Sequence, residues 1–287
     1  MSFVTDSQAP AVLFPGQGSQ TPEMRDHVAR LAPDLLERVT DLVGEDPFPR
    51  VEESTRFAQP AIFCASVTAY DALGLEPGVA AGHSLGELAA LVAAGVIERD
   101  DALELVVLRG RLMAEADDTG SMLALVGATE EEAREIAAHA GVTVANDNAP
   151  GQVVLSGARD MLAQAEEDAR DHGRRALKLN VAGAFHSPLM EPAVAPFREA
   201  LDAIELGEPR FPVVSCASAQ PFTDVRAELA AALTSPVRWR ETMLALHGAG
   251  ATRFVEVGPG KVLARLGKRI LTDGPKVETP SLEAANA

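Results

Sequence analysis

Short apolar runs alternate with longer helical stretches through the first third of the chain. The run AVLFPG at residues 11–16 predicts a buried strand that enters a glycine-rich turn, and residues 59–73 predict a buried helix. A second short run, GVAAG at 78–82, precedes a helical stretch at 85–95. This alternation of strand, turn and helix predicts a parallel sheet with helices on its faces.

The middle of the chain has a different order of elements. Four strand patterns and two helical patterns follow one another, with strands at 121–127, 141–147, 151–157 and 175–182 and helices at 129–140 and 158–173. Thr129 precedes three glutamates and is typical of a helix N-cap. The order β-α-β-β-α-β is ferredoxin-like. We therefore expect residues 121–184 to form a small subdomain inserted into a core made of residues 1–120 and 185–287.

Beyond residue 184 the alternation of helices and strands resumes. Helical patterns cover 188–203, 225–234, 236–249 and 261–271, and strand patterns cover 211–216 and 253–258. The last eight residues, PSLEAANA, carry neither pattern, and we expect them to be loose.

Composition narrows the class of protein. The 287 residues are 47% apolar and 23% charged, as in globular proteins. No apolar run approaches about 20 residues and the start MSFVTDSQAP lacks the features of a signal peptide, so we expect no membrane association. Cys64 and Cys216 are the two cysteines, and we expect buried free thiols in a cytoplasmic protein. The net charge of −17 argues against nucleic acid as a partner.

The pentapeptide Gly82-His83-Ser84-Leu85-Gly86 fits G-x-S-x-G between a predicted strand and a predicted helix. This is the context of a nucleophile elbow, in which glycines allow the tight turn that exposes the serine hydroxyl. We expect the helix to begin at Ser84, where its free N–H groups can hold negative charge. Ser84 is the candidate nucleophile, and the alternative is a plain glycine-serine turn. The predicted fold is an α/β-hydrolase-like parallel-sheet core with an inserted ferredoxin-like subdomain.

An elbow serine needs a base. Four of the six histidines lie in or beside helical patterns and are expected at the surface: His27, His139, His172 and His247. His83 belongs to the elbow, but its side chain should point away from that of Ser84. His186 lies in the small-residue loop GAFHSP, where the chain returns from the inserted subdomain to the core. Because such junctions often line clefts, His186 is the candidate base.

One arginine falls on an apolar helix face. In the helical pattern at 101–116, Leu105, Leu108 and Leu112 form a stripe, and Arg109 lies on it. An inward guanidinium stays protonated and requires an anion. That anion is either an internal carboxylate or the carboxylate of a substrate held in a bidentate clamp.

Seven sequence blocks together resemble a known family. They are FPGQGSQ (14–20), GHSLGE (82–87), RG (109–110), NDNAPGQVVLSG (146–157), AFHSP (184–188), SPVRW (235–239) and EVGPGK (256–261). In this order they closely resemble the malonyl-CoA:acyl-carrier-protein transacylases of bacterial fatty-acid synthesis, and they are similar to the acyltransferase domains of polyketide synthases. The resemblance covers about residues 11–271.

The resemblance implies a ping-pong acyl transfer. His186 would take the proton of Ser84 as it attacks malonyl-CoA, and the N–H groups of Gln17 and Leu85 would stabilise the oxyanion. Arg109 would pair with the malonyl carboxylate. The malonyl-serine would then pass its acyl group to the phosphopantetheine thiol of acyl carrier protein. Coenzyme A enters only as a thioester substrate, so no cofactor is expected, and no cluster has the spacing of a metal site.

The resemblance also concerns residues around the dyad. In the family the histidine is oriented by a main-chain carbonyl, usually of a glutamine, and that position here is Ala232. Phe185 resembles the residue by which malonyl-selective polyketide acyltransferases disfavour methylmalonyl, and the alternative is that it only packs. His83 and Gln17 are expected to line the substrate site.

A carrier protein is acidic, so an acidic enzyme needs a local basic surface to dock it. The candidates are Arg238, Arg240, Lys261, Arg265, Lys268 and Arg269. The alternative is ordinary surface charge. We expect the protein to be a monomer.

Three other functions stay open. A trans-acting malonyl acyltransferase of a polyketide synthase or malonate decarboxylase system would use the same chemistry with another carrier. A serine esterase or thioesterase would use an acidic triad member and has no evident use for Arg109. A non-catalytic docking module would not need Ser84, His186 and Arg109 together.

Overall fold

The computed structural model describes residues 8–116, 119–181 and 183–282. These residues form a five-stranded sheet and a four-stranded sheet. The five-stranded sheet contains β1 (Ala11–Phe14), β2 (Val79–Gly82), β7 (Val213–Val214), β8 (Phe254–Glu256) and β9 (Val277–Glu278). The four-stranded sheet contains β3 (Gly120–Val126), β4 (Thr143–Ala149), β5 (Gln152–Ala158) and β6 (Arg175–Lys178).

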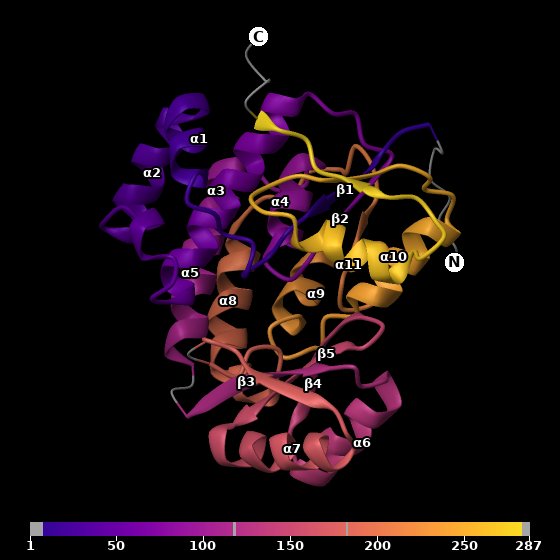
Figure 1. The fold of residues 1–287 in the computed structure, drawn as a ribbon. Helices are drawn as coiled ribbons and strands as arrows, with labels where there is room; N and C mark the ends of the chain where they lie inside the picture. The colour runs from indigo at the N-terminus through magenta and orange to yellow at the C-terminus, as the bar shows by residue number, and fades with distance from the viewer. Residues whose placement is uncertain (1–7, 117–118, 182, 283–287) are drawn as a thin grey trace.

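Helices cover both faces of the larger sheet and one face of the smaller sheet. They are α1 (Met24–Leu31), α2 (Pro33–Val43), α3 (Thr55–Leu73), α4 (Gly86–Ala93), α5 (Arg99–Glu115), α6 (Glu130–Ala140), α7 (Arg159–Asp171), α8 (Glu191–Ala203), α9 (Val225–Ala231), α10 (Trp239–Gly248) and α11 (Val262–Ile270), with 3-10 turns at Phe48–Arg50 and Pro188–Met190. In Figure 1 the four-stranded sheet forms a separate lower lobe with α6 and α7, and the remaining helices pack around the five-stranded sheet.

The larger sheet has the order β7-β2-β1-β8-β9, and all of its neighbouring strands are parallel, as predicted. Residues of β1 alternate between two cores: Val12 and Phe14 pack in the cluster that includes α3, α4 and α5, whereas Ala11 and Leu13 pack with α10 and α11. The sheet is therefore covered on both faces. Phe14 pairs with Gly82, so the turns that follow β1 and β2 meet at one edge of the sheet.

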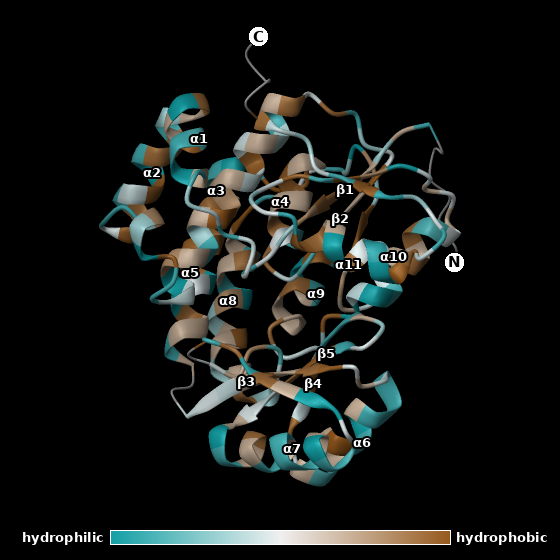
Figure 2. Ribbon diagram, viewed as in Figure 1, coloured by the Kyte–Doolittle hydropathy of each residue, from teal (hydrophilic) through white to brown (hydrophobic). Residues whose placement is uncertain are grey.

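The smaller sheet has the order β4-β5-β3-β6 and is antiparallel, which confirms the ferredoxin-like arrangement. Leu123 and Val153 pack against α6 and α7, whereas Met122 and Val154 point to the larger body and join its core. In Figure 2 the strands of the small lobe are brown over part of their length, and α6 and α7 carry teal segments on the outside of the lobe. Thr129 caps α6, as predicted from the sequence, and with Glu132 it forms a complete capping box.

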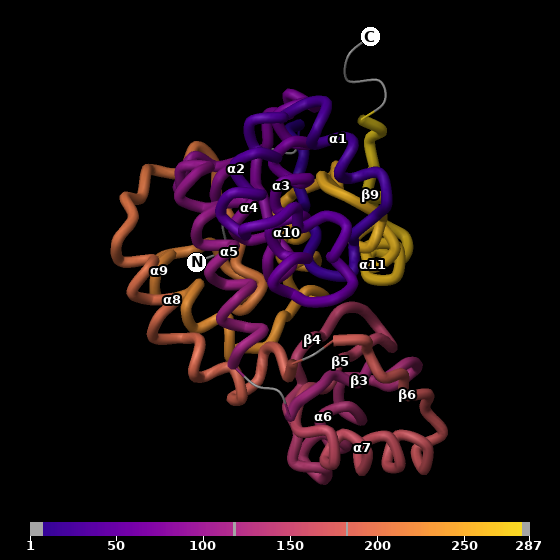
Figure 3. The backbone as a smooth tube through the Cα atoms, turned by 90° about the vertical axis from the view of Figure 1, so that its left-hand side faces the viewer, coloured from indigo at the N-terminus to yellow at the C-terminus, as the bar shows by residue number. Residues whose placement is uncertain are grey.

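Strand β4 connects the two lobes. Its residue Asn146 forms a parallel bridge with Val237, just before α10. Figure 3 shows β4 on the side of the small lobe that faces α11 and the rest of the larger body. Segments far apart in the sequence therefore meet along β4.

Several expected boundaries were wrong. The elbow helix α4 begins at Gly86 and not at Ser84, because the backbone of Ser84 has φ +53° and cannot start a helix. The pattern at 211–216 forms only the two residues of β7, and that at 236–249 becomes helical only at Trp239. Helix α2 and strand β9 were not predicted, and the helical pattern around His27, which becomes α1, was given no bounds. Of the expected loose tail, residues 283–287 lie outside the described residues.

Two further expectations concern the whole chain. Among the described residues, no helix is long and apolar enough to cross a membrane. Cys64 and Cys216 are both buried free thiols.

Candidate active site

Ser84 sits in a strained turn between β2 and α4. Its φ of +53° lies in the left-handed region, which few residues other than glycine adopt. A Cβ on Gly82 would lie 1.9 Å from the carbonyl carbon of Gly86, and one on Gly86 would lie 2.1 Å from the carbonyl oxygen of Phe14. Both positions therefore accept only glycine. The turn matches the elbow predicted from the sequence.

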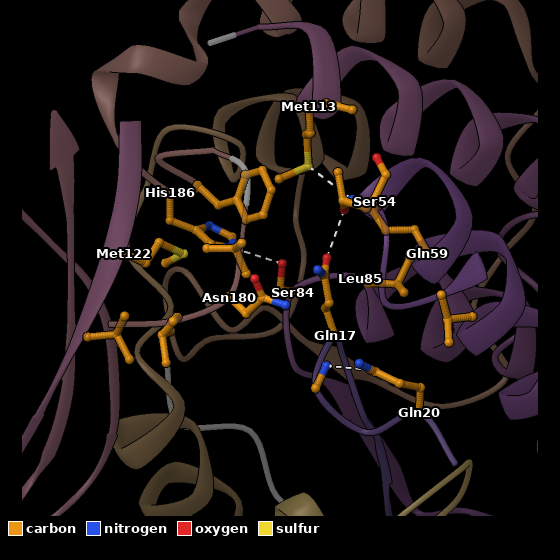
Figure 4. A pocket seen from close by; sticks show the side chains of 18 of the residues that line it. Gln17, Gln20, Ser54, Gln59, Ser84, Leu85, Met113, Met122, Asn180 and His186 are labelled. Carbon is orange, nitrogen blue, oxygen red and sulfur yellow. Dashed lines mark hydrogen bonds between the residues drawn. The ribbon is translucent and has the colours of Figure 1, made fainter. Parts of the chain in front are cut away.

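His186 faces the serine from the loop before α8. Its Nε2 lies 2.8 Å from Ser84 Oγ, as the dashed line in Figure 4 marks. Its Nδ1 lies 3.0 Å from the carbonyl oxygens of both Ala232 and Ser235. Because carbonyls only accept hydrogen bonds, Nδ1 carries the proton and Nε2 is free to accept the proton of Ser84. The contact of Ala232 agrees with the expectation, whereas that of Ser235 was not predicted.

The imidazole of His186 is held neutral. Its side chain is buried, and burial together with the charge of Arg109 lowers the pKa of His186 to about 3. A neutral imidazole is the form that can act as a base.

Arg109 lies beneath the serine hydroxyl. Its side chain is buried, with the residue 5% exposed. One Nη donates to Gln59 Oε1 at 2.6 Å, and the other Nη lies 3.1 Å from Ser84 Oγ. Among the described residues it makes no salt bridge, although burial lowers the pKa of the guanidinium only to about 10 and leaves it charged at neutral pH. The internal carboxylate that the sequence allowed as an alternative is therefore not its direct partner. A buried cation beside the nucleophile is left able to bind an anion.

Known proteins resemble this chain over nearly its whole length. The chain matches the acyl transferase domain family over residues 12–282. The chain belongs to the acyl transferase domain family. A malonyl CoA-acyl carrier protein transacylase from Haemophilus influenzae is 37% identical over 96% of this chain and 97% of its own length.

Solved structures agree with this result. A malonyl CoA-acyl carrier protein transacylase from Coxiella burnetii aligns with a TM-score of 0.90 and 30% identity over 98% of this chain and 97% of its own. A malonyl-transacylase solved in complex with a type II polyketide synthase acyl-carrier protein aligns with a TM-score of 0.85 and 35% identity over 94% of each chain. The protein is thus an acyltransferase with the expected α/β-hydrolase-like core.

The acyltransferase site opens into a cavity of about 340 Å³ between the two lobes. Ser84, His186 and Arg109 line it, and Gln17, Leu85, His83 and Phe185 line it with them. The structure therefore brings together every site residue predicted from the sequence. Figure 4 shows Gln17 and Leu85 on one side of Ser84 and His186 on the other.

The loop after β1 supplies Gln17. A Cβ on Gly16 would lie 2.4 Å from the carbonyl oxygen of His83, so this loop and the elbow are in direct contact. Within the described part of the chain, the backbone N–H groups of Gln17 and Leu85 have no hydrogen-bond acceptor. Leu85 immediately precedes α4, where the helix dipole adds positive potential. The acyltransferase thus presents two free donors near Ser84.

His83 and Phe185 shape the cavity wall. His83 donates from Nε2 to Asn148 Oδ1 at 2.8 Å and its ring lies 5.4 Å from that of Trp239. Burial lowers the pKa of His83, so it is neutral. Phe185 is buried, and a Cβ on Gly183 would lie 2.7 Å from its ring. Gly183 is therefore needed for the position of this ring.

Sequence reasoning missed the residues that hold Arg109. Gln59, on α3, accepts from Arg109 and donates to Thr55 Oγ1 at 2.8 Å, and Thr55 donates to Gln17 Oε1 at 2.8 Å. The available signal was one carboxamide within the otherwise apolar run at residues 57–65 of α3. In the part of the chain described, no group of three or more His, Cys, Asp or Glu side chains could hold a metal ion.

Proposed function

We propose that this acyltransferase moves the malonyl group from malonyl-CoA to the phosphopantetheine thiol of acyl carrier protein, and so supplies fatty-acid synthesis. The observation that carries the proposal is the buried charge of Arg109, which lies 3.1 Å from Ser84 Oγ and has no carboxylate partner among the described residues. An acyl group that ends in a carboxylate satisfies this cation while its thioester meets the serine. A neutral acyl group leaves it unpaired.

The first half-reaction follows from the geometry. Ser84 Oγ attacks the thioester carbon as its proton passes to His186 Nε2, and the N–H groups of Gln17 and Leu85 hold the oxyanion. The carbon–sulfur bond then breaks, and coenzyme A leaves as a thiol with the proton from His186. The product is a malonyl ester of Ser84, with Arg109 on its free carboxylate.

The second half-reaction reverses these steps. The carrier thiol gives its proton to His186 and attacks the ester carbon, and Ser84 regains the proton when the carbon–oxygen bond breaks. The cycle uses side chains of one chain and requires no cofactor or metal. This supports a monomer, and the buried thiols of Cys64 and Cys216 support the cytoplasm as its compartment. The residues that act here lie in 1–120 and 185–287, which we propose as the catalytic core, with 121–184 as the inserted subdomain.

Carrier docking is assigned to the basic residues of α11. Arg238 is paired with Glu241, and Arg240 with Glu130 and Asp147, so these two expected residues are already neutralised. Lys261, Arg265, Lys268 and Arg269 form no salt bridge within the described ranges. An acidic carrier would therefore meet α11 first. A related malonyl-transacylase was solved in complex with a type II polyketide synthase carrier, so a polyketide carrier is a second candidate acceptor.

The test is the mass of the intact chain after incubation with malonyl-CoA and no carrier. We expect a malonyl adduct on the native chain, none on Ser84→Ala, and little on Arg109→Ala. Arg111→Ala is the matched control, because Arg111 lies two residues further along α5 and is exposed. Free malonate without adduct would indicate an esterase. Equal adduct on Arg109→Ala and Arg111→Ala would exclude the proposed carboxylate clamp.

A further inference from the structure

The thiol of Cys216 and the carboxyl group of Glu87 lie buried beside the elbow, and neither takes part in the acyl transfer described above. The two residues are 1% and 2% exposed. Val214 of β7 pairs with Ala81 of β2, so the chain just after β7 runs beside the turn that carries Ser84. Because polar groups stay in a core only when they are hydrogen-bonded, the partners of these two indicate what they do.

The elbow and the loop after β7 each hold a backbone N–H group of the other. The N–H of Ser84 donates to Cys216 Sγ at 3.4 Å, and among the described residues it has no oxygen acceptor. The N–H of Cys216 donates in return to Glu87 Oε1 at 2.7 Å. Ser84 precedes the start of α4 at Gly86, and Glu87 lies just inside the helix. The elbow is therefore tied to this loop at two points.

The loop itself is held in place. The carbonyl of Cys216 accepts from the N–H of Arg238, just before α10, at 2.6 Å. The carboxyl group of Glu87 also forms hydrogen bonds with the thiol of Cys216 and with the hydroxyl of Ser215. Cys216 cannot move without breaking bonds to α4 and to the segment before α10. It therefore gives the elbow a fixed point of attachment.

The backbone of Ser84 needs such support. Its φ of +53° is one that a residue with a Cβ keeps only where its surroundings hold it there. The next N–H along the chain is that of Leu85, one of the two proposed oxyanion donors. A change in the backbone of Ser84 therefore displaces the nucleophile and this donor together. Arg109 is held separately, by Gln59 of α3.

We propose that Glu87 and Cys216, called here the elbow pair, are positioning residues that hold the Ser84 hydroxyl and the Leu85 N–H in register for the same thioester. The inference rests on the proposed function for its acyl donor. Neither member of the elbow pair lines the cavity. Loss of Cys216 should therefore slow acyl transfer and leave substrate binding unchanged, because the two depend on different contacts.

The test separates rate from binding. We measure single-turnover malonylation of Ser84 over a range of malonyl-CoA concentrations, which gives a maximal rate and a half-saturating concentration. We expect Cys216→Ala to lower the maximal rate about 10-fold and to keep the half-saturating concentration within about twofold, as expected when catalytic groups are misplaced. Cys216→Val, which fills the space but accepts no hydrogen bond, should be equally slow. Cys216→Ser should recover most of the rate, because a hydroxyl accepts from the Ser84 N–H and donates to Glu87.

The matched control is Cys64→Ala. Cys64 is also a buried thiol, but it lies on α3 and does not line the cavity. The substitution removes the same atoms from the core and no contact of the elbow. We expect its maximal rate to stay within about twofold of the native rate, because the site is independent of the elbow.

A double-variant cycle tests Glu87. Glu87→Met removes the acceptor of the Cys216 N–H and should slow malonylation about 10-fold, whereas Glu87→Gln keeps an acceptor and should retain most of the rate. Combined with Cys216→Ala, Glu87→Met should still give a loss of about 10-fold and not about 100-fold, because both substitutions release the same attachment.

Three results would overturn the inference. They are a native maximal rate in Cys216→Val, a loss in Cys64→Ala equal to that in Cys216→Ala, and losses that multiply in the double variant. Failure of the native chain to form a malonyl-serine would instead refute the proposed function, and the role of the elbow pair with it.

Discussion

Thr55 lies between the support of Arg109, the proposed carboxylate clamp, and the loop of Gln17, which is proposed to hold the oxyanion. Its hydroxyl can be removed without substituting Arg109 or Gln17. It donates to Gln17 Oε1 at 2.8 Å and accepts from Gln59 Nε2 at 2.8 Å, and Gln59 in turn holds Arg109. Thr55 and Gln59 are 5% and 1% exposed. Thr55→Val is nearly isosteric and breaks both hydrogen bonds of the hydroxyl.

The magnitude follows from those two bonds. Each contributes about 0.5–1.5 kcal/mol, and the buried amide of Gln59 loses its better acceptor, so we expect Thr55→Val to lower the free energy of unfolding by about 2–3 kcal/mol. Because Gln17 and Arg109 both become less fixed, we expect about 10-fold slower malonylation of Ser84, in line with the cost of misplacing catalytic groups.

Urea unfolding and single-turnover mass spectrometry measure the two effects. Thr55→Ser is the matched control, since it keeps the hydroxyl and should retain most of both quantities. Native stability and loading within twofold in Thr55→Val would show that the hydroxyl chain has no role. Equal impairment of Thr55→Ser and Thr55→Val would show that the packing of the whole side chain, and not its hydroxyl alone, is required.

Three further predictions concern other parts of the site. Because the pKa of His186 is about 3 in the folded chain and about 6.5 when unfolded, acid favours the unfolded form. Protonation of His186 in the unfolded chain should therefore lower the free energy of unfolding by about 1.4 kcal/mol as the pH falls from 7.5 to 5.5. Urea titrations of His186→Gln should not show this loss. Phe185→Leu should raise methylmalonyl loading relative to malonyl about 10-fold in a competition assay, and an unchanged ratio would leave Phe185 only a packing role. Lys268→Glu should raise the KM for carrier protein about 3-fold while malonylation from malonyl-CoA stays unchanged, and equal carrier kinetics would remove α11 as the docking surface.

The parts of the site that the sequence predicts are those with local causes. The elbow depends on Gly82 and Gly86, which lie within two residues of Ser84, so the pentapeptide itself contains the residues that allow the turn. The support of Arg109 comes instead from Gln59, 50 residues earlier in the chain. Helical periodicity placed Arg109 inside but could not choose its partner, because that choice depends on how α3 packs against α5. The length of β7 likewise depends on neighbouring strands and not on its own apolar residues.

The charges of the site explain why one arginine can serve both half-reactions. The charge of the buried Glu87 acts on Arg109, but burial raises the pKa of Glu87 to about 7, so it neutralises the guanidinium only in part. Burial, and after it the charge of Arg109, lower the pKa of His186 and keep its imidazole neutral. The malonyl carboxylate pairs with Arg109 in both half-reactions and offsets that charge, whereas burial continues to hold the pKa of His186 below its ordinary value. A neutral imidazole can accept the proton of Ser84 in the first half-reaction and the proton of the carrier thiol in the second. Because the same carboxylate is bound in both steps, one arginine serves both.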